Sequence, residues 1–183
     1  MSLQMGTKKG IALAQFGQVL EYPSKINAQS RQRLCDSIVL SYPKAAKEID
    51  QFCSYCSCVE LSKLEEVFTR TFDLAAICSP YVTGYIFGDE NFDRGTLMAV
   101  LGEKYTEYGF NSGGELPDHL AILLRFSGWL DEEALDELIK FCLLQPVSEM
   151  VDRLKDSDNP YYFLLSALLV VLKCDLSGDS KHD

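Results

Sequence analysis

The sequence predicts an all-α protein that folds as a single globular domain of about eight to ten short amphipathic helices. Apolar residues recur at spacings of three and four along most of the chain, which is the helical pattern. Runs with strand alternation joined by hairpin turns are missing from the sequence. The 183 residues, 47% of them hydrophobic, suffice for one core, and no repeat or linker divides 1–183. The first few residues and about 176–183 are expected to be flexible tails.

The first two helices follow from their apolar faces. Leu13, Phe16 and Leu20 share one side of a first helix, which Pro23 ends. A second helix is expected over 30–40, where apolar residues again recur at helical spacing.

A third helix should follow Pro43, and a fourth should span 61–74. The third carries an apolar stripe that consists of Ala45, Ile49, Phe52 and Cys56. In the fourth, Ser62 and Glu65 have the spacing of a capping box, in which two side chains bond backbone N–H groups at the start of a helix.

A non-helical stretch is expected over 79–91, where Pro80 and Gly88 interrupt the helical pattern. Its glycines are compatible with a loop that orders on partner binding. Asp93 has the chemistry of an N-cap for the next helix, and Gly109 suits that helix's C-terminal end.

The C-terminal part of the chain is also predicted to be helical. Pro117 is expected as the first residue of a helix, where a missing N–H has no cost. Asp131 should cap the following helix, helix signals resume over 146–154, and Asn159 with Pro160 opens a last, strongly apolar helix. The helix after Pro117 is expected to bury Ile122, Phe126, Trp129 and Leu130.

The charge balance indicates which partners to expect. The chain has 17 Lys plus Arg against 27 Asp plus Glu, a formal net charge of −10. Such a charge repels phosphate backbones, which argues against nucleic-acid binding, and favours peptides rich in Arg or Lys. The alternative is that the acidity serves only solubility.

The sequence indicates a cytoplasmic protein. No signal peptide is recognised before the seven cysteines, which are expected to be free thiols in a reducing compartment. The longest apolar run, 161–172, is shorter than the ~20 residues of a membrane span, so no stable membrane insertion is expected.

Cys53, Cys56 and Cys58 raise the question of a metal site. A tetrahedral zinc site needs four ligands, usually as two separated pairs, and here there is one cluster in a chain with 2 histidines. Cys53 and Cys56 also lie beside a helical apolar stripe. We therefore favour core packing and expect neither a bound metal nor a cofactor.

The segment Glu115-Leu116-Pro117-Asp118-His119 opens a predicted helix after a Gly-Gly turn. The positive end of that helix would favour the Asp118 carboxylate and keep His119 neutral at pH 7. The residues therefore suit a binding site, although Pro followed by Asp is also an ordinary helix opening.

Catalytic templates are scarce. Neither a nucleophile elbow nor a Gly-rich phosphate loop with its Lys occurs. A magnesium site built from Asp89, Glu90, Asp93 and Glu107 remains an alternative to a solvated acidic surface.

The segment 70–126 resembles the NarJ-type branch of the TorD/DmsD/NarJ chaperones, the assembly factors of molybdopterin oxidoreductases. The motifs that carry the resemblance are Phe72-Asp73-Leu74, Ser79-Pro80-Tyr81, Gly88-Asp89, Arg94-Gly95, Tyr105 with Gly109-Phe110, and Glu115 to Leu120. The N-terminal Leu20-Glu21-Tyr22-Pro23 is similar to the family's Leu-x-Tyr-Pro opening, and Arg153-Leu154 and Pro160-Tyr161 fit its C-terminal part.

This resemblance implies an all-α fold, a cytoplasmic location and no catalytic turnover. It implies a partner: the N-terminal region of a molybdopterin oxidoreductase catalytic subunit, which carries a twin-arginine signal or its remnant. Holding that subunit would allow cofactor insertion before membrane attachment or export. Pro117, Asp118 and His119 match the family's signal-peptide-binding motif, and the adjacency of Pro and Asp favours a nitrate-reductase-like client. The protein is expected as a monomer or dimer.

We therefore hypothesise that an amphipathic client peptide lies in a groove between helices, with its basic residues against carboxylates. In this hypothesis His119 gives a hydrogen bond, and Tyr81 or Tyr85 forms an apolar wall. The predicted peptide-binding residues are Glu115, Pro117, Asp118, His119, Asp89, Glu107, Tyr81 and Tyr85. The alternatives are a generic acidic helical interaction module and a magnesium-dependent phosphohydrolase.

Overall fold

The computed structural model describes residues 6–25, 27–74, 76–88 and 92–174, and over these ranges the fold is all-α, as predicted. The N-terminal elements are α1 (Lys8–Val19), α2 (Ala28–Ser41), the 3₁₀ turn η1 (Pro43–Ala45), α3 (Ala46–Cys58) and α4 (Leu61–Phe72). The later elements are α5 (Thr83–Phe87), α6 (Asp93–Tyr108), α7 (Leu120–Ser127), α8 (Glu132–Leu138), the π-helical turn η2 (Ile139–Leu143), α9 (Leu144–Leu154) and α10 (Tyr161–Lys173). The expected flexible tails fall largely outside the described ranges.

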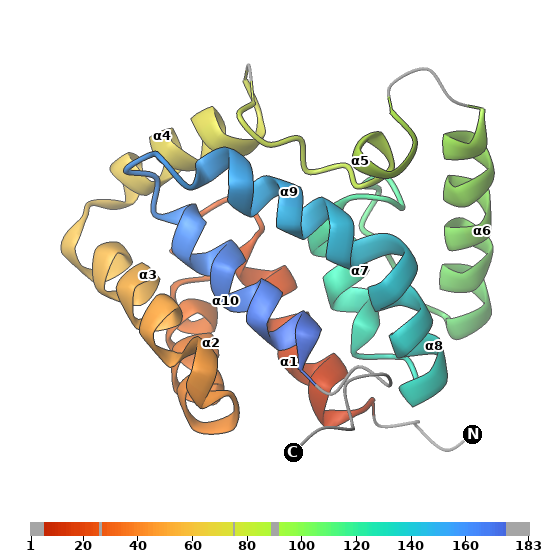
Figure 1. Cartoon of the computed structure of the whole chain (residues 1–183), viewed down its shortest axis with the longest axis horizontal. Coiled ribbons are helices and arrows are strands. Elements are labelled where there is room, and N and C mark those ends of the chain that lie inside the picture. Colours follow the sequence, from red (N-terminus) through yellow and green to blue (C-terminus); the bar gives the residue numbers. More distant parts are fainter. Residues whose placement is uncertain (1–5, 26, 75, 89–91, 175–183) are drawn as a thin grey trace, which may run out of the picture.

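Helix α10 lies in the middle of the molecule, with α9 on one side and α1 and α3 close by (Figure 1). It is apolar almost all round, as expected of a helix enclosed by others. Its start is fixed by Asn159, whose side-chain oxygen accepts from the Tyr161 N–H at 3.0 Å. The amide nitrogen of Asn159 donates to the Thr71 hydroxyl oxygen at 2.7 Å, which ties α10 to α4. The predicted opening of the last helix at Asn159 and Pro160 is confirmed.

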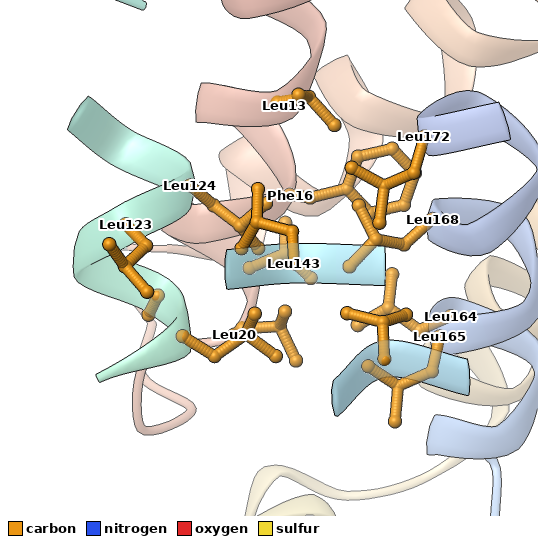
Figure 2. Close-up of a cluster of buried hydrophobic side chains, with 14 of the residues drawn as sticks. Leu13, Phe16, Leu20, Leu123, Leu124, Leu143, Leu164, Leu165, Leu168 and Leu172 are labelled. Carbon is orange, nitrogen blue, oxygen red and sulfur yellow. The ribbon is translucent and has the colours of Figure 1, made fainter. Parts of the chain in front are cut away.

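The core is one continuous cluster of buried side chains contributed by elements from both ends of the chain. Figure 2 shows leucines of α1, α7, η2 and α10 converging with Phe16. Leu13, Phe16 and Leu20, predicted to share one face, are all buried here.

Helices α1 and α7 approach each other closely because glycines line their contact. A methyl group on Gly10 would lie 2.3 Å from the Ser127 carbonyl oxygen, and one on Gly17 would lie 2.6 Å from that of Ala121. Real side chains essentially never approach backbone so closely, so each position accepts only glycine at this separation. The close contact holds α7, and with it the chain just before α7, against α1.

Some predicted boundaries are wrong. Segment 79–91 contains the short helix α5, and α7 begins at Leu120 instead of Pro117. Helix α4 begins at Leu61, one residue before Ser62, and its N-cap Glu60 makes no side-chain cap bond, so the predicted capping box does not form. Trp129 lies beyond the end of α7 and is 43% exposed instead of buried.

Other predicted ends are confirmed. The Asp131 side chain accepts from the Ala134 N–H at 2.9 Å and caps α8. Gly109 ends α6 with φ +68°, a left-handed conformation that favours glycine. The predicted N-cap at Asp93, in contrast, is wrong, because Asp93 is the first residue of α6. Over the described ranges, every helix falls short of the length and apolarity that a membrane crossing requires.

Candidate peptide-binding site

Two segments far apart in the sequence run side by side just before α5 and α7. The Val82 N–H donates to the Asp118 carbonyl oxygen at 3.0 Å, and the Leu120 N–H donates to the Pro80 carbonyl oxygen at 2.8 Å. These bonds form a short antiparallel bridge between Tyr81 and His119. The bridge joins the Ser-Pro-Tyr motif to the Glu115–Leu120 motif.

Tyr81, His119 and Glu115 are brought together by this bridge. The Tyr81 ring packs edge-on against the His119 ring, with 5.5 Å between centroids. The Tyr81 hydroxyl donates to Glu115 Oε1 at 3.3 Å, and the same oxygen accepts from the Leu116 N–H at 2.9 Å. Burial first, and then the Glu115 charge, raises the pKa of Tyr81, so its hydroxyl keeps its proton at neutral pH.

His119 is the N-cap of α7. Its Nδ1 accepts from the Ala121 N–H at 3.2 Å, a bond that requires an unprotonated Nδ1. Burial lowers the pKa of His119 below its ordinary value of 6.5, against the opposing charges of Glu115, Asp118 and Glu21. The prediction of a neutral His119 is thus supported, with burial as the cause instead of the helix dipole.

Asp118 does not lie on the surface, contrary to the expectation that it meets a basic peptide directly. Its side chain is 1% exposed, and its Oδ2 accepts from the Thr83 hydroxyl. The hydroxyl oxygen of Thr83 in turn accepts from Arg94 Nε at 3.2 Å. The carboxylate is enclosed because α5 folds over it. Asp118 therefore ties α5 and the start of α6 to the segment before α7.

Pro117 has a comparable structural setting. Its carbonyl oxygen accepts from the Tyr105 hydroxyl at 2.7 Å, and Tyr105 is 4% exposed. This bond fixes the 115–119 segment against α6. Since α7 starts only at Leu120, Pro117 shapes the approach to the helix and not its first turn.

Two predicted residues do not join this group. Tyr85 is 8% exposed, donates to the Ser79 carbonyl oxygen at 3.0 Å and lies under the Arg153 guanidinium, so it forms no open wall. Glu107 binds Lys104 at 2.9 Å and, two residues after Tyr105, points to the opposite side of α6 from Pro117. Asp89 lies outside the described residues.

The structure adds neighbours that sequence reasoning did not assign to the site. Tyr22 is 53% exposed and packs on Phe68, which lines a small cavity together with His119. The charge of Asp73 acts on Tyr81, and Asp73 is exposed. Both residues belong to motifs that carry the family resemblance, Leu20–Pro23 and Phe72–Leu74. The sequence therefore held the signal, but their proximity in space could not be read from it.

We call this region the Tyr81 surface, which consists of Tyr22, Asp73, Tyr81, Glu115, Leu116 and His119. It contains the carboxylates of Glu115 and Asp73 and half-exposed apolar groups such as Leu116, which is 50% exposed. The arrangement suits a cationic, partly apolar polypeptide, because charge and aromatic faces both attract basic side chains.

The metal alternatives gain no support from the geometry. Within the described ranges, no group of three or more His, Cys, Asp and Glu side chains is placed to hold an ion. Asp93 and Glu107 stand at opposite ends of α6, about 21 Å apart by helical rise, and cannot share one magnesium. Burial raises the pKa of Cys56 to about 11, so this thiol stays protonated, and Cys53 Sγ lies 3.7 Å from the Arg31 carbonyl oxygen.

The fold is shared with a solved all-helical protein, a putative redox enzyme maturation protein from Archaeoglobus fulgidus. That structure superposes with a TM-score of 0.61 at 18% identity, covering 92% of this chain and 96% of the other. The sequence profile of the nitrate reductase delta subunit family matches residues 40–166. This chain belongs to the nitrate reductase delta subunit family. It is also 28% identical over 168 residues to the probable nitrate reductase molybdenum cofactor assembly chaperone NarW of Escherichia coli (strain K12), covering 90% of this chain and 69% of that protein.

Proposed function

We propose that this protein is an assembly chaperone for a molybdenum-containing reductase and that it binds the N-terminal region of the catalytic subunit at the Tyr81 surface. The observation that carries the proposal is the convergence of separate family-like motifs on that one surface. Four stretches, 20–23, 72–74, 79–81 and 115–120, meet there although almost a hundred residues separate the first from the last.

The chemistry of the surface favours a basic amphipathic segment. Glu115 and Asp73 supply negative charge, whereas the nearby Glu21 is paired with Arg125 at 2.9 Å. Tyr22 and Tyr81 offer aromatic faces for cationic side chains, and Leu116 offers apolar area. A remnant or complete twin-arginine signal would present this combination of basic and apolar groups.

In this proposal Asp118 acts through other residues. Its bond from Thr83 keeps α5 in place, and the backbone bonds around it keep Tyr81 beside His119. Loss of Asp118 would therefore loosen the surface without removing a charge that the client touches.

The chaperone would act in the cytoplasm, hold the client while its cofactor is inserted, and release it before membrane attachment or export. Release requires moderate affinity. A dissociation constant near micromolar corresponds to about −8 kcal/mol. No reaction on the client is required of this chain.

Calorimetry with the N-terminal peptide of the client subunit tests the proposal. Glu115→Gln should weaken binding about two- to fivefold, the range of an exposed ion pair, and Tyr81→Ala should weaken it about tenfold. Glu133→Gln, an identical charge change on exposed α8, is the matched control and should leave affinity unchanged. Equal affinities for all of these variants would reject the Tyr81 surface as the binding site.

Co-purification from the native cell tests the identity of the client. The proposal expects a molybdenum-enzyme catalytic subunit among the captured proteins. Capture of unrelated proteins through the same surface would instead indicate a generic interaction module.

A further inference from the structure

A second concave surface lies along α1 and the C-terminal end of α7 and differs in charge from the Tyr81 surface. It is an open groove with a volume of about 650 Å³. Helix α1 contributes its outer face, α2 contributes Arg33, and the end of α7 with the turn after α6 contributes the remainder. We call it the arginine groove, which consists of Ile11, Gln15, Arg33, Phe110, Arg125 and Trp129.

The charge of this groove is opposite to that of the protein as a whole. The described residues that line it include two arginines and no carboxylate, whereas the chain carries a net charge of −10. Arg125 is bound by Glu21 at 2.9 Å from outside the lining. Arg33 is exposed and has no ion-pair partner among the described residues. A guanidinium presents several donors in a plane, a geometry that matches carboxylates.

The groove also offers apolar area. Ile11 is 47% exposed and Trp129 is 43% exposed, so both present apolar area to an occupant. The Arg125 guanidinium lies over the Phe110 ring at 5.9 Å from its centroid. Gln15 Oε1 is shielded from solvent and has no hydrogen-bond partner among the described residues.

We infer that the arginine groove binds an acidic stretch of a partner polypeptide in which Asp or Glu alternates with apolar residues. Carboxylates would meet Arg33 and Arg125, and apolar side chains would cover Ile11 and Trp129. A nucleic acid fits less well. It would extend beyond a groove of this size onto the rest of the surface, which is strongly acidic and repels phosphates. The inference stands apart from the Tyr81 surface, which favours cationic groups.

The chain has a built-in reporter for this groove, since Trp129 is its only tryptophan. Intrinsic tryptophan emission therefore reports on the groove alone. The probe is a synthetic peptide in which Glu alternates with Leu, and its matched counterpart has Gln in place of every Glu. The acidic peptide should shift Trp129 emission to shorter wavelength in a saturable manner, because apolar contact displaces water from the indole. The Gln peptide should bind at least about fivefold more weakly.

Charge-reversal variants locate the contact. Arg33→Glu should weaken binding of the acidic peptide at least fivefold. Lys44→Glu makes the same charge reversal at an exposed site beside a separate cavity and should change the affinity less than twofold. Circular dichroism melting verifies that both variants fold alike. An absent emission shift, or equal losses in the two variants, would overturn the inference.

Two further measurements separate this inference from its competitors. The basic N-terminal peptide of the client should bind without shifting Trp129 emission. If the acidic peptide does not bind the arginine groove, the proposed function still stands, and if the client peptide does not bind the Tyr81 surface, the inference about the groove still stands. Light scattering measures the mass of the chain in solution. A dimer that Arg33→Glu dissociates would show that a second copy occupies the groove and would contradict an acidic partner segment.

Discussion

Gly17 lies where α1 crosses α7, and its replacement by alanine tests the packing that positions the site. A methyl group there would lie 2.6 Å from the Ala121 carbonyl oxygen and 2.8 Å from the Arg125 backbone nitrogen. Both atoms belong to the α7 backbone, so neither can turn aside as a side chain would. The helices must separate, or α7 must shift.

The expected magnitude follows from two opposing effects. Alanine normally stabilises a helix by about 0.5–1 kcal/mol relative to glycine. Overpacking a well-filled contact costs about 1–3 kcal/mol. We expect Gly17→Ala to lower the free energy of unfolding by about 1–2 kcal/mol, which corresponds to roughly 2–8 °C in Tm for a chain of this size.

Urea denaturation followed by circular dichroism measures this change. Gly102→Ala is the matched control, because Gly102 also lies inside a helix but a methyl group there would meet nothing within 4 Å. The control should gain about 0.5–1 kcal/mol. A Gly17→Ala variant as stable as Gly102→Ala would refute the close contact between α1 and α7.

Three further predictions concern buried polar groups. Burial lowers the pKa of His119 in the folded state, so the unfolded chain binds a proton at His119 more readily than the folded chain does. The stability that neutral His119 contributes is therefore complete above pH 6.5 and is lost as pH falls through the folded-state pKa. His119→Asn keeps an N-cap that does not titrate, so urea denaturation between pH 7.5 and pH 5 should show a smaller acid-induced loss than in the parent. Asp118→Ala should lower the free energy of unfolding by about 1–3 kcal/mol, because it leaves the Thr83 hydroxyl without its acceptor. Amide hydrogen exchange should rise in α5, and unchanged exchange there would contradict the positioning role of Asp118. Asn159→Ala should also cost about 1–3 kcal/mol, because it removes the acceptor of the Tyr161 N–H and the donor to Thr71. Thermal melting that matches the parent would contradict this.

Much of the fold could be predicted because helical periodicity is a local property. The faces of α1 and α3, the cap at Asp131 and the start of the last helix after Asn159 depend on residues within a few positions of each other. Trp129 was misassigned because the apolar pattern of α7 continues past the residue where the helix ends, and periodicity alone does not mark that end.

The site was harder to predict because it depends on contacts between distant segments. Asp118 looks like a surface carboxylate in the sequence, yet Thr83, 35 positions earlier, encloses it and donates to it. Glu107 is close to the motif in sequence but points away from it, because Tyr105 uses the facing side of α6. The sequence predicts Glu115, Tyr81 and His119 as members of one site, and the structure brings them into contact, but the contacts themselves depend on the pairing of two distant segments.

Site-specific photo-crosslinking tests the central claim most directly. A photoreactive amino acid at the position of Leu116, which is 50% exposed on the Tyr81 surface, is irradiated in the presence of the client subunit, and mass spectrometry identifies the joined peptides. Leu40, 84% exposed on α2, provides the control position. We predict crosslinks from position 116 to the N-terminal region of a reductase catalytic subunit and few from position 40. Crosslinks from position 40 alone, or from position 116 only to other regions of the client, would contradict the account.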